Sequence, residues 1–315
     1  MLILIISFFF VELIFGALYD FLVLVADAMH MLTDAIALVI GLYAFIKSKK
    51  VRTDKATFGF VRMEVVGGLV NGCFLMVIAF DIFREAITLL LKNEVNKDLV
   101  ENSGVLLIIG GIGLGVNIIG LIVFGFDHGH GHSDDNSEKK KNFNIQAVFL
   151  HVLGDALGSV AVIVSCLVIR YSTWERRTII DPICSMIISV IIFATSIPVV
   201  RGTVRVLLEK VPTTVDLYLL KRKLLAIDGI KNIHELHVWQ LNSNKTLATC
   251  HVILDKSKNF KRLNDDIQKV FHGCGVHSTT IQPEFQSGSK DCFDIVCGST
   301  RCIEELCCEK IESDD

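Results

Sequence analysis

The sequence predicts an α-helical membrane protein with six membrane-spanning helices, followed by a small α+β domain. Two observations support this fold class. The chain has 315 residues, of which 51% are hydrophobic, and its mean hydropathy of +0.53 is too high for an ordinary soluble domain. The apolar residues fill the first 200 positions, whereas the remaining positions mix polar and apolar residues. We therefore expect a transmembrane domain at 1–200, a second domain at 201–285 and a disordered, Cys-rich tail at 286–315.

Six segments have the length and composition of membrane helices, which need about 20 mostly apolar residues. They are Leu2–Tyr19, Phe21–Ile46, Val65–Leu91, Val105–Phe126, Ala147–Tyr171 and Ile179–Val200. Lys and Arg are more frequent in the loops after spans two, four and six than in the opposite loops. Because basic loops stay in the cytosol, we expect both termini to be cytosolic. Arg176 and Arg177, after span five, oppose this bias weakly.

Beyond position 200 the pattern changes to that of a small α+β domain. Residues 216–227 predict a helix, and "IHELHVWQL" and "TLATCHVILD" predict two strands. The turn residues Asn242, Ser243 and Asn244 lie between these strands, which indicates a hairpin. A helix at 260–272 and a last strand, "VHSTTIQPEF", complete the order helix, strand, strand, helix, strand.

Two of the apolar spans contain the same polar pair. His30 and Asp34 lie in "ADAMHMLTDA", and His151 and Asp155 lie in "LHVLGDALGS". Residues four apart project from one face of a helix, and ionisable side chains at membrane depth mark ion or substrate paths. If the two faces meet, two imidazoles and two carboxylates form a ligand set that suits tetrahedral Zn²⁺. The competing interpretation is that each His packs or stabilises its own helix, but this does not explain the repetition.

These motifs resemble those of the cation diffusion facilitator family of metal–proton antiporters. The resemblance covers nearly the whole chain, including "FGFVRMEVVGGLVN", "FLHVLGDALGS", "HELHVWQL" and "HSTTIQPEF". The eukaryotic zinc-transporting branch has His-x-x-x-Asp in both spans, and this chain keeps all four residues. Val61 stands where many intracellular-vesicle members have His, so the chain is most similar to the plasma-membrane zinc exporters. A manganese-selective relative has Asn at the position of His30, which favours zinc here.

The resemblance also implies an architecture and a location. It implies a cytosolic, metallochaperone-like C-terminal domain and a homodimer in the lipid bilayer. It implies alternating access coupled to protons, at the plasma membrane or, as the alternative, in endomembrane vesicles. Bacterial relatives join the positions of Arg62 and Glu209 by a charge interlock near the dimer interface; an ordinary interfacial charge is the competing interpretation.

The resemblance points to a second metal site in the C-terminal domain. Bacterial relatives bind regulatory zinc with residues that match His234 and His251. They also use a His and an Asp near the last strand, where this chain has Gln282 and Glu284. The loss of that His puts a complete site in doubt.

Three further features have two interpretations each. His128, His130 and His132 form either a weak zinc-binding loop or a solvated loop without an essential role. Asp27 either lines the ion path or is an ordinary hydrogen-bonded helix residue. The tail cysteines either bind soft metals or are reduced or lipidated thiols; they are Cys292, Cys297, Cys302, Cys307 and Cys308.

We therefore expect a proton-coupled antiporter that moves Zn²⁺ out of the cytosol. Zinc binds neutral His and ionised Asp, so metal binding and proton release are linked. One alternative is transport of Mn²⁺, Co²⁺ or Cd²⁺ through the same site, and another is a membrane-tethered zinc sensor. The sequence shows neither a nucleophile–base set nor a phosphate-binding loop, so an enzyme is not expected. The net charge of −3 gives no indication of nucleic-acid binding.

Overall fold

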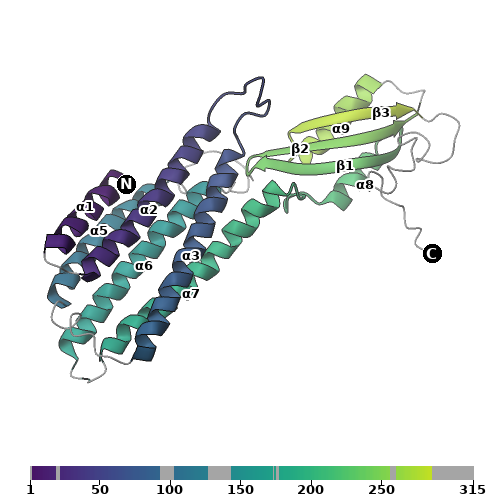
Figure 1. Ribbon diagram of the computed structural model, residues 1–315. Helices are drawn as coiled ribbons and strands as arrows, with labels where there is room; N and C mark the ends of the chain where they lie inside the picture. The colour runs from purple at the N-terminus through teal and green to yellow at the C-terminus, as the bar shows by residue number, and fades with distance from the viewer. Residues whose placement is uncertain are drawn as a thin grey trace. The chain divides into compact units, whose positions relative to one another are not determined.

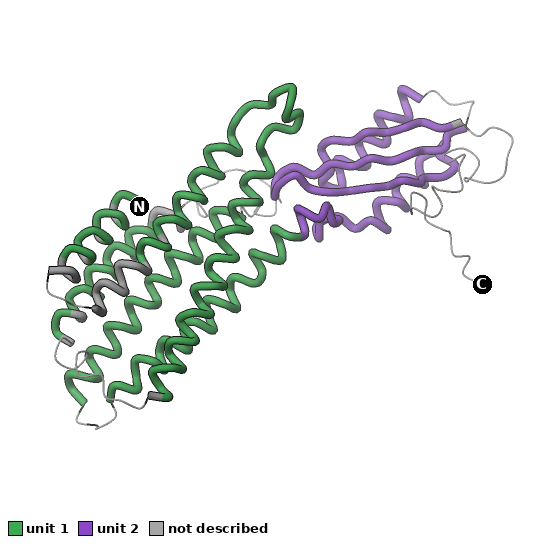
Figure 2. The backbone as a smooth tube through the Cα atoms, in the orientation of Figure 1, with its two compact units in different colours: residues 1–204 green, residues 205–315 purple. Residues whose placement is uncertain are grey.

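The computed structural model describes residues 2–18, 22–92, 103–126, 143–172, 174, 177–255 and 260–285. It divides the chain into two compact units, residues 1–204 and 205–315, which Figure 2 distinguishes by colour. The division lies near the boundary expected at position 200. The expected disordered tail at 286–315 lies outside the described residues and stays a prediction.

Long helices make up the first unit (Figure 1). The described residues contain α1 (Leu2–Leu18), α2 (Leu22–Ser48), α3 (Met63–Lys92), α5 (Ser103–Phe126), α6 (Phe143–Tyr171) and α7 (Ile180–Leu207), with a short 3-10 turn at Arg177–Ile179 before α7. Four stretches within them are long and apolar enough to cross a membrane: Met31–Ser48, Met63–Leu91, Phe143–Tyr171 and Arg177–Leu207. A shorter apolar stretch, Leu107–Ile122, lies in α5. The helices follow the order of the predicted spans.

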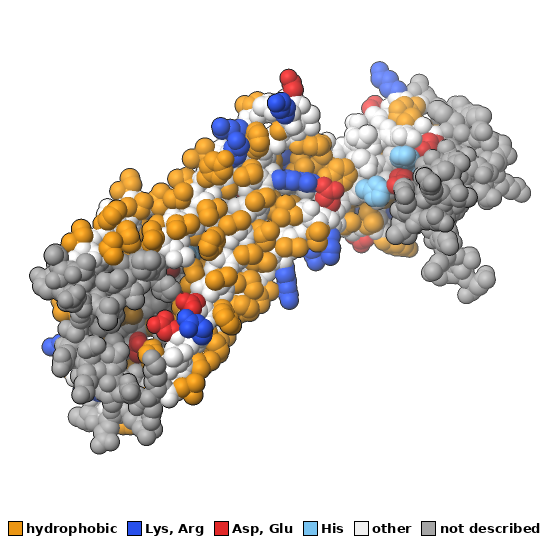
Figure 3. Space-filling view, in the orientation of Figure 1, with side chains coloured by type: hydrophobic (Ala, Val, Ile, Leu, Met, Phe, Trp, Pro, Cys, Tyr) orange, Lys and Arg blue, Asp and Glu red, His pale blue; other side chains and the backbone are white. Residues whose placement is uncertain are grey.

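The outer surface of this unit is apolar, as a lipid-facing surface should be. Hydrophobic side chains predominate on the described part of this unit in Figure 3, and Val77, Phe80 and Ile108 are each about two-thirds exposed, at 65%, 66% and 65%. Soluble proteins rarely expose apolar patches of this extent. The exposure therefore agrees with the helical membrane domain that the sequence predicts.

Small residues let the helices approach closely inside the unit. A Cβ atom on Gly67 of α3 would collide with the Cβ of Ala44 of α2, and one on Gly202 of α7 would lie 2.5 Å from the ring of Phe143 on α6. Glycine and alanine at such contacts are typical of membrane helix packing. Farther along, Leu75 of α3 packs against Ile192 of α7.

Several helices extend beyond the predicted spans. α3 begins at Met63 instead of Val65, α6 begins at Phe143 instead of Ala147, and α7 continues to Leu207 instead of Val200. Hydropathy marks only the part of a helix that lies in hydrocarbon, whereas the hydrogen-bonded backbone continues where polar side chains meet water.

The second unit has the predicted order of helices and strands. α8 (Leu217–Leu225) is capped by Asp216, whose carboxylate accepts a hydrogen bond from the Leu219 backbone N–H at 3.0 Å. It is followed by β1 (Ile230–Asn242), β2 (Lys245–Leu254), α9 (Phe260–Gly273) and β3 (Ser278–Phe285). The predicted fold class, a helical membrane domain followed by a small α+β domain, is confirmed.

The strands form one sheet in the order β1-β2-β3. β1 and β2 are an antiparallel hairpin, and the Asn242 side chain closes its turn by accepting hydrogen bonds from the backbone N–H groups of Asn244 and Lys245. β2 and β3 run parallel. One face of the sheet packs against both helices, through fully buried residues such as Leu220, Val252 and Phe271. The other face is free of these helices and carries the polar cluster described below.

Candidate metal sites

Helix α6 carries one of the two predicted His–Asp pairs. His151 is buried, with 4% of its surface exposed, and Asp155 is half-buried one turn further along. The Ser159 hydroxyl donates a hydrogen bond to the Asp155 backbone carbonyl at 3.0 Å and lies 3.4 Å from the Asn117 side-chain nitrogen on α5. A polar strip therefore runs along this face of α6 from His151 toward α5.

A buried hydrogen bond joins α6 to α2. The Asn144 side-chain amide donates to the Gly41 backbone carbonyl at 2.9 Å, and the absence of a side chain at Gly41 makes room for it. One turn further along α6, Val148 packs against Ala35 and Leu38 of α2. Residue numbers rise on α6 as they fall on α2, so the two helices run antiparallel where they meet.

This register has a consequence for the four predicted ligands. His151 and Asp155 lie seven and eleven residues after Asn144, while Asp34 and His30 lie seven and eleven residues before Gly41. At about 3.6 residues per turn these separations are close to two and three whole turns, so all four positions lie on the meeting faces. The seven-residue and eleven-residue separations are the same on α6 and α2, and the helices are antiparallel. Position 34 is therefore level with His151, and position 30 is level with Asp155. The side chains of His30, Asp34 and Asp27 lie outside the described part of the structure.

Asn71 of α3 adds a second carboxamide to this region. It is 4% exposed, and a Cβ atom on Gly41 would lie 2.8 Å from its side-chain nitrogen and 3.4 Å from the Asn144 side-chain oxygen. In the described part of the chain, the Asn71 side-chain oxygen has no hydrogen-bond partner. α2, α3 and α6 thus enclose a small polar node about two turns from His151. Asn144 was not among the predicted site residues, because it lies outside the apolar run that marks the span.

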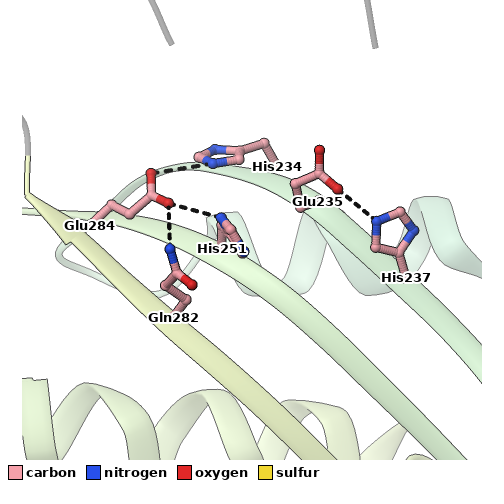
Figure 4. Close-up of polar contacts among 6 residues, drawn as sticks. All are labelled: His234, Glu235, His237, His251, Gln282 and Glu284. Carbon is pink, nitrogen blue, oxygen red and sulfur yellow. Dashed lines mark hydrogen bonds and ion pairs between the residues drawn. The ribbon is translucent and has the colours of Figure 1, made fainter. Parts of the chain in front are cut away.

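A second cluster lies on the open face of the sheet in unit two (Figure 4). Glu284 of β3 directs its carboxylate at both His234 of β1 and His251 of β2. Its carboxylate oxygens are 2.8 Å from His251 Nδ1 and 3.2 Å from His234 Nε2, and the two imidazole ring centres are 5.2 Å apart. Glu284 is 8% exposed. The Gln282 side-chain nitrogen donates to the same carboxylate at 3.3 Å.

Strand pairing explains why these residues meet. His234 pairs directly with His251 across β1 and β2, and His251 pairs with Gln282 across β2 and β3. Glu284 is two residues beyond Gln282, so it projects from the same face. The β1 ladder shifts between His234 and His237, where Glu235 has a positive φ of 49°. Such a bulge re-aims the side chains on either side of it.

The cluster has the donor types of a metal site. One ligand atom from each of His234, His251 and Glu284 lies within 4.8 Å of the other two. Two imidazoles and a carboxylate with a fourth position open to water are a common zinc ligand set. His234 and His251 are the two ligands that the resemblance predicts, and Gln282 stands where relatives have a further His. The structure adds Glu284 as the third donor. Gln282 directs its nitrogen at the carboxylate in this arrangement.

Two neighbouring residues lie outside the cluster. His237 is beyond the bulge and contacts Glu235 at 2.8 Å, with 63% of its side chain exposed. Cys250 is adjacent to His251 in sequence but faces the helices, and burial raises the pKa of its thiol to about 12. A thiol that stays protonated is a poor metal ligand, because the thiolate is the form that binds metal.

The other predicted sites are not tested by the structure. His128, His130, His132 and the tail cysteines Cys292, Cys297, Cys302, Cys307 and Cys308 lie outside the described residues. Arg62 precedes α3 in the first unit, and Glu209 follows α7 in the second. Their interlock therefore stays a prediction.

Comparisons with known proteins follow the same division of the chain. Residues 1–208 match the model of the cation efflux transmembrane domain, and residues 212–285 match that of the cation efflux protein cytoplasmic domain. The vacuolar zinc transporter ZRC1 of Saccharomyces cerevisiae is 30% identical, over 89% of this chain and 81% of its own. The cadmium, cobalt and zinc/H(+)-K(+) antiporter of Bacillus subtilis is 31% identical, over 89% and 86%. The calcium/manganese antiporter SLC30A10 of Homo sapiens is 28% identical, over 98% and 83%.

Proposed function

Because the chain belongs to the cation efflux family of membrane transporters, we propose that it moves Zn²⁺ out of the cytosol in exchange for protons. The hydrogen bond from Asn144 to Gly41 carries the proposal. It gives the register in which the α2 positions 30 and 34 are level with Asp155 and His151. Two His–Asp pairs that are 121 residues apart in sequence thereby become candidates for one four-ligand site.

The transported ion binds to His30, Asp34, His151 and Asp155. The two carboxylates neutralise the charge of Zn²⁺, which is otherwise costly at membrane depth. The two imidazoles bind only when they are deprotonated, so zinc entering from the cytosol displaces protons. On the far side, protonation of the same groups releases the metal, since His titrates near neutral pH.

Proton exchange as the energy source has support from a relative. The Bacillus subtilis protein is named as an antiporter that exchanges metal for H⁺ and K⁺. The chain itself contains ligands whose metal affinity depends on pH.

Zinc is the proposed substrate because His30 supplies a borderline-soft nitrogen ligand where a manganese-type relative has Asn. Imidazole suits zinc, whereas oxygen donors suit Mn²⁺ and Ca²⁺. The human relative's name, a calcium/manganese antiporter, keeps a broader divalent-metal substrate as the second candidate. Competition by Mn²⁺, Co²⁺ and Cd²⁺ for ⁶⁵Zn²⁺ uptake separates the two.

The proposal includes a homodimer in the plasma membrane, with both termini in the cytosol. The resemblance to plasma-membrane exporters supports this location, while the Saccharomyces cerevisiae relative is named as a vacuolar protein, which makes endomembranes the alternative. We place the His234–His251–Glu284 cluster in the cytosol as a regulatory metal site. If the protein were only a membrane-tethered sensor, it would bind metal there but would not sustain zinc flux against a gradient.

Zinc flux in proteoliposomes tests the proposal. With an imposed pH gradient, the native chain accumulates ⁶⁵Zn²⁺ against its gradient, and collapse of the pH gradient stops this uphill flux. His151→Ala and Asp155→Ala abolish flux, whereas His237→Ala, which removes an exposed imidazole, leaves it unchanged. Native flux in His151→Ala would sink the ligand assignment. Uphill flux that survives collapse of the pH gradient would sink the proton coupling.

A further inference from the structure

The loop between α2 and α3 carries a dense positive charge. Over residues 47–55 there are five basic side chains, Lys47, Lys49, Lys50, Arg52 and Lys55, and a single acidic one, Asp54. All except Lys47 are exposed. We call residues 47–60 the basic loop. It begins at the last two residues of the apolar stretch Met31–Ser48 and precedes the apolar stretch Met63–Leu91, so we expect both of its ends at a membrane surface.

Among the described residues, these five basic side chains have no acidic partner within ion-pair distance. Basic residues elsewhere do pair, as Arg84 does with Asp81 at 2.7 Å and Lys269 with Asp266 at 2.9 Å. An external anion is therefore free to approach the basic loop.

The loop has a defined backbone conformation. Thr53 and Ala56 exchange two backbone hydrogen bonds, of 3.2 and 2.9 Å, around the turn residues Asp54 and Lys55. Gly59 then adopts a positive φ of 71°, a conformation that favours glycine. Lys55 thus lies on a formed turn and Arg52 directly precedes it, which lowers the entropy that binding has to remove from this part of the loop.

Aromatic and aliphatic side chains accompany the charges. The Lys47 ammonium lies 4.5 Å from the centre of the Phe60 ring, and the Lys49 ammonium lies 4.1 Å from that of Phe45. Val51 and Phe58 are 83% and 56% exposed. Exposed apolar residues beside Lys and Arg are the composition of segments that lie in the headgroup region of a bilayer.

We propose that the basic loop binds anionic phospholipid headgroups, with Val51 and Phe58 inserted at the membrane interface. Clusters of four to eight Lys and Arg next to a membrane helix attract anionic lipids, and each basic residue contributes about a fivefold gain in affinity. The positive-inside rule accounts for the sign of the loop but not for its exposed apolar residues or its formed turn. This lipid site is independent of which metal the protein carries.

Quenching by brominated lipids tests the proposal on the full-length chain. Trp174 and Trp239, its two tryptophans, are replaced by Phe, and Phe58→Trp supplies a single fluorescent reporter in the loop. The protein is reconstituted in phosphatidylcholine vesicles that contain either brominated phosphatidylserine or brominated phosphatidylcholine. From the quenching we calculate the affinity of each lipid for the loop. We expect the affinity for phosphatidylserine to be at least about fivefold higher than that for phosphatidylcholine. High salt should reduce this preference, because salt screens surface charges.

Matched variants connect the preference to the loop. The ratio of the affinity for phosphatidylserine to that for phosphatidylcholine should fall close to one in the triple variant Lys49→Gln/Lys50→Gln/Lys55→Gln. Arg substitutions at the same three positions should keep the native ratio. Lys221→Gln/Arg222→Gln/Lys223→Gln removes equal charge from α8 and should also keep it. Equal quenching by both lipids in the native loop, or a preference that survives the loop Gln variant, overturns the proposal. Loss of the preference when inorganic phosphate replaces chloride at constant ionic strength overturns it in favour of a soluble anion.

Discussion

The Asn144 side chain donates a hydrogen bond to the backbone carbonyl of Gly41, so a polar side chain on α6 reaches the main chain of α2 inside the membrane domain. A Cβ at position 41 would lie 2.8 Å from the Asn71 side-chain nitrogen and 3.4 Å from the Asn144 side-chain oxygen, so glycine leaves room there for both carboxamides. The contact between Asn144 and Gly41 therefore does two things. It depends on close packing of α2 against α6, and it sets the register of the proposed metal ligands on the two helices. Changes that separate α2 from its neighbours should disturb both stability and transport.

Gly67→Ala tests this close packing. A Cβ at Gly67 would collide with the Cβ of Ala44, and neither atom can move without the backbone of α2 or α3. Overpacking of this kind costs about 1–3 kcal/mol, so the thermal unfolding midpoint in detergent should fall and zinc flux should fall with it. Gly115→Ala on α5 is the control, since no atom lies within 4 Å of its added Cβ. Equal midpoints for the two variants would contradict the packing of α2 on α3.

Glu284→Gln tests the metal cluster of the second unit. The substitution keeps the size of the side chain but removes the carboxylate that lies between His234 and His251. Zinc affinity at this site should fall by about tenfold or more, because a neutral amide is a weak zinc ligand. The measurement is competition with a fluorescent chelator in an Asp155→Ala background, which removes one ligand of the proposed transport site. Glu235→Gln, which alters the carboxylate that pairs with His237, should leave affinity unchanged.

Gln282→His makes the opposite change in the same site. Gln282 lies beside His251 in the sheet, and its side chain already reaches the Glu284 carboxylate. An imidazole there supplies a fourth donor and completes a tetrahedral set, so zinc affinity should rise by roughly tenfold or more. Gln268→His places an equal imidazole on the exposed face of α9 and should have no effect. Unchanged affinity in Gln282→His would show that position 282 does not point at the bound metal.

Several parts of this structure follow from the sequence. The apolar runs predict the membrane helices because hydrocarbon tolerates few polar residues over about 20 positions. The alternation in "IHELHVWQL" predicts β1 because one face of the sheet packs against helices. The repeated His-x-x-x-Asp stands out because each copy is polar within an apolar run.

Other parts depend on long-range contacts that local patterns do not contain. Asn144 lies at the polar start of α6, where hydropathy gives no helix signal, and its partner Gly41 is 103 residues away in sequence. The resemblance marks Glu284 as standing near a ligand position of bacterial relatives, but only the parallel pairing of β3 with β2 shows that it reaches His251. The bulge at Glu235 was also not predicted, because a positive φ at a Glu has no local sequence signal.

Cys250 should remain unreactive until the domain unfolds. Its side chain is buried under α8 and α9, and burial raises the pKa of the thiol from 9.0 to about 12. Because the thiolate is the reactive form, iodoacetamide at pH 8 should not label Cys250 in the folded protein. The half-buried Cys274, in the same unit, should be labelled and serves as the internal control. Peptide mass spectrometry measures both, and equal labelling would contradict the burial of Cys250.

The same pKa difference predicts a loss of stability at alkaline pH. Below pH 9 the thiol is protonated in both states, so its titration does not affect folding. Between pH 9 and about 12 the unfolded chain ionises while the folded domain holds the proton, so rising pH favours unfolding. Cys250→Ala lowers stability at neutral pH through a small cavity, but its unfolding midpoint should fall less steeply than that of the native chain over this interval. Parallel slopes for the two proteins would show that another group, and not Cys250, controls the alkaline transition.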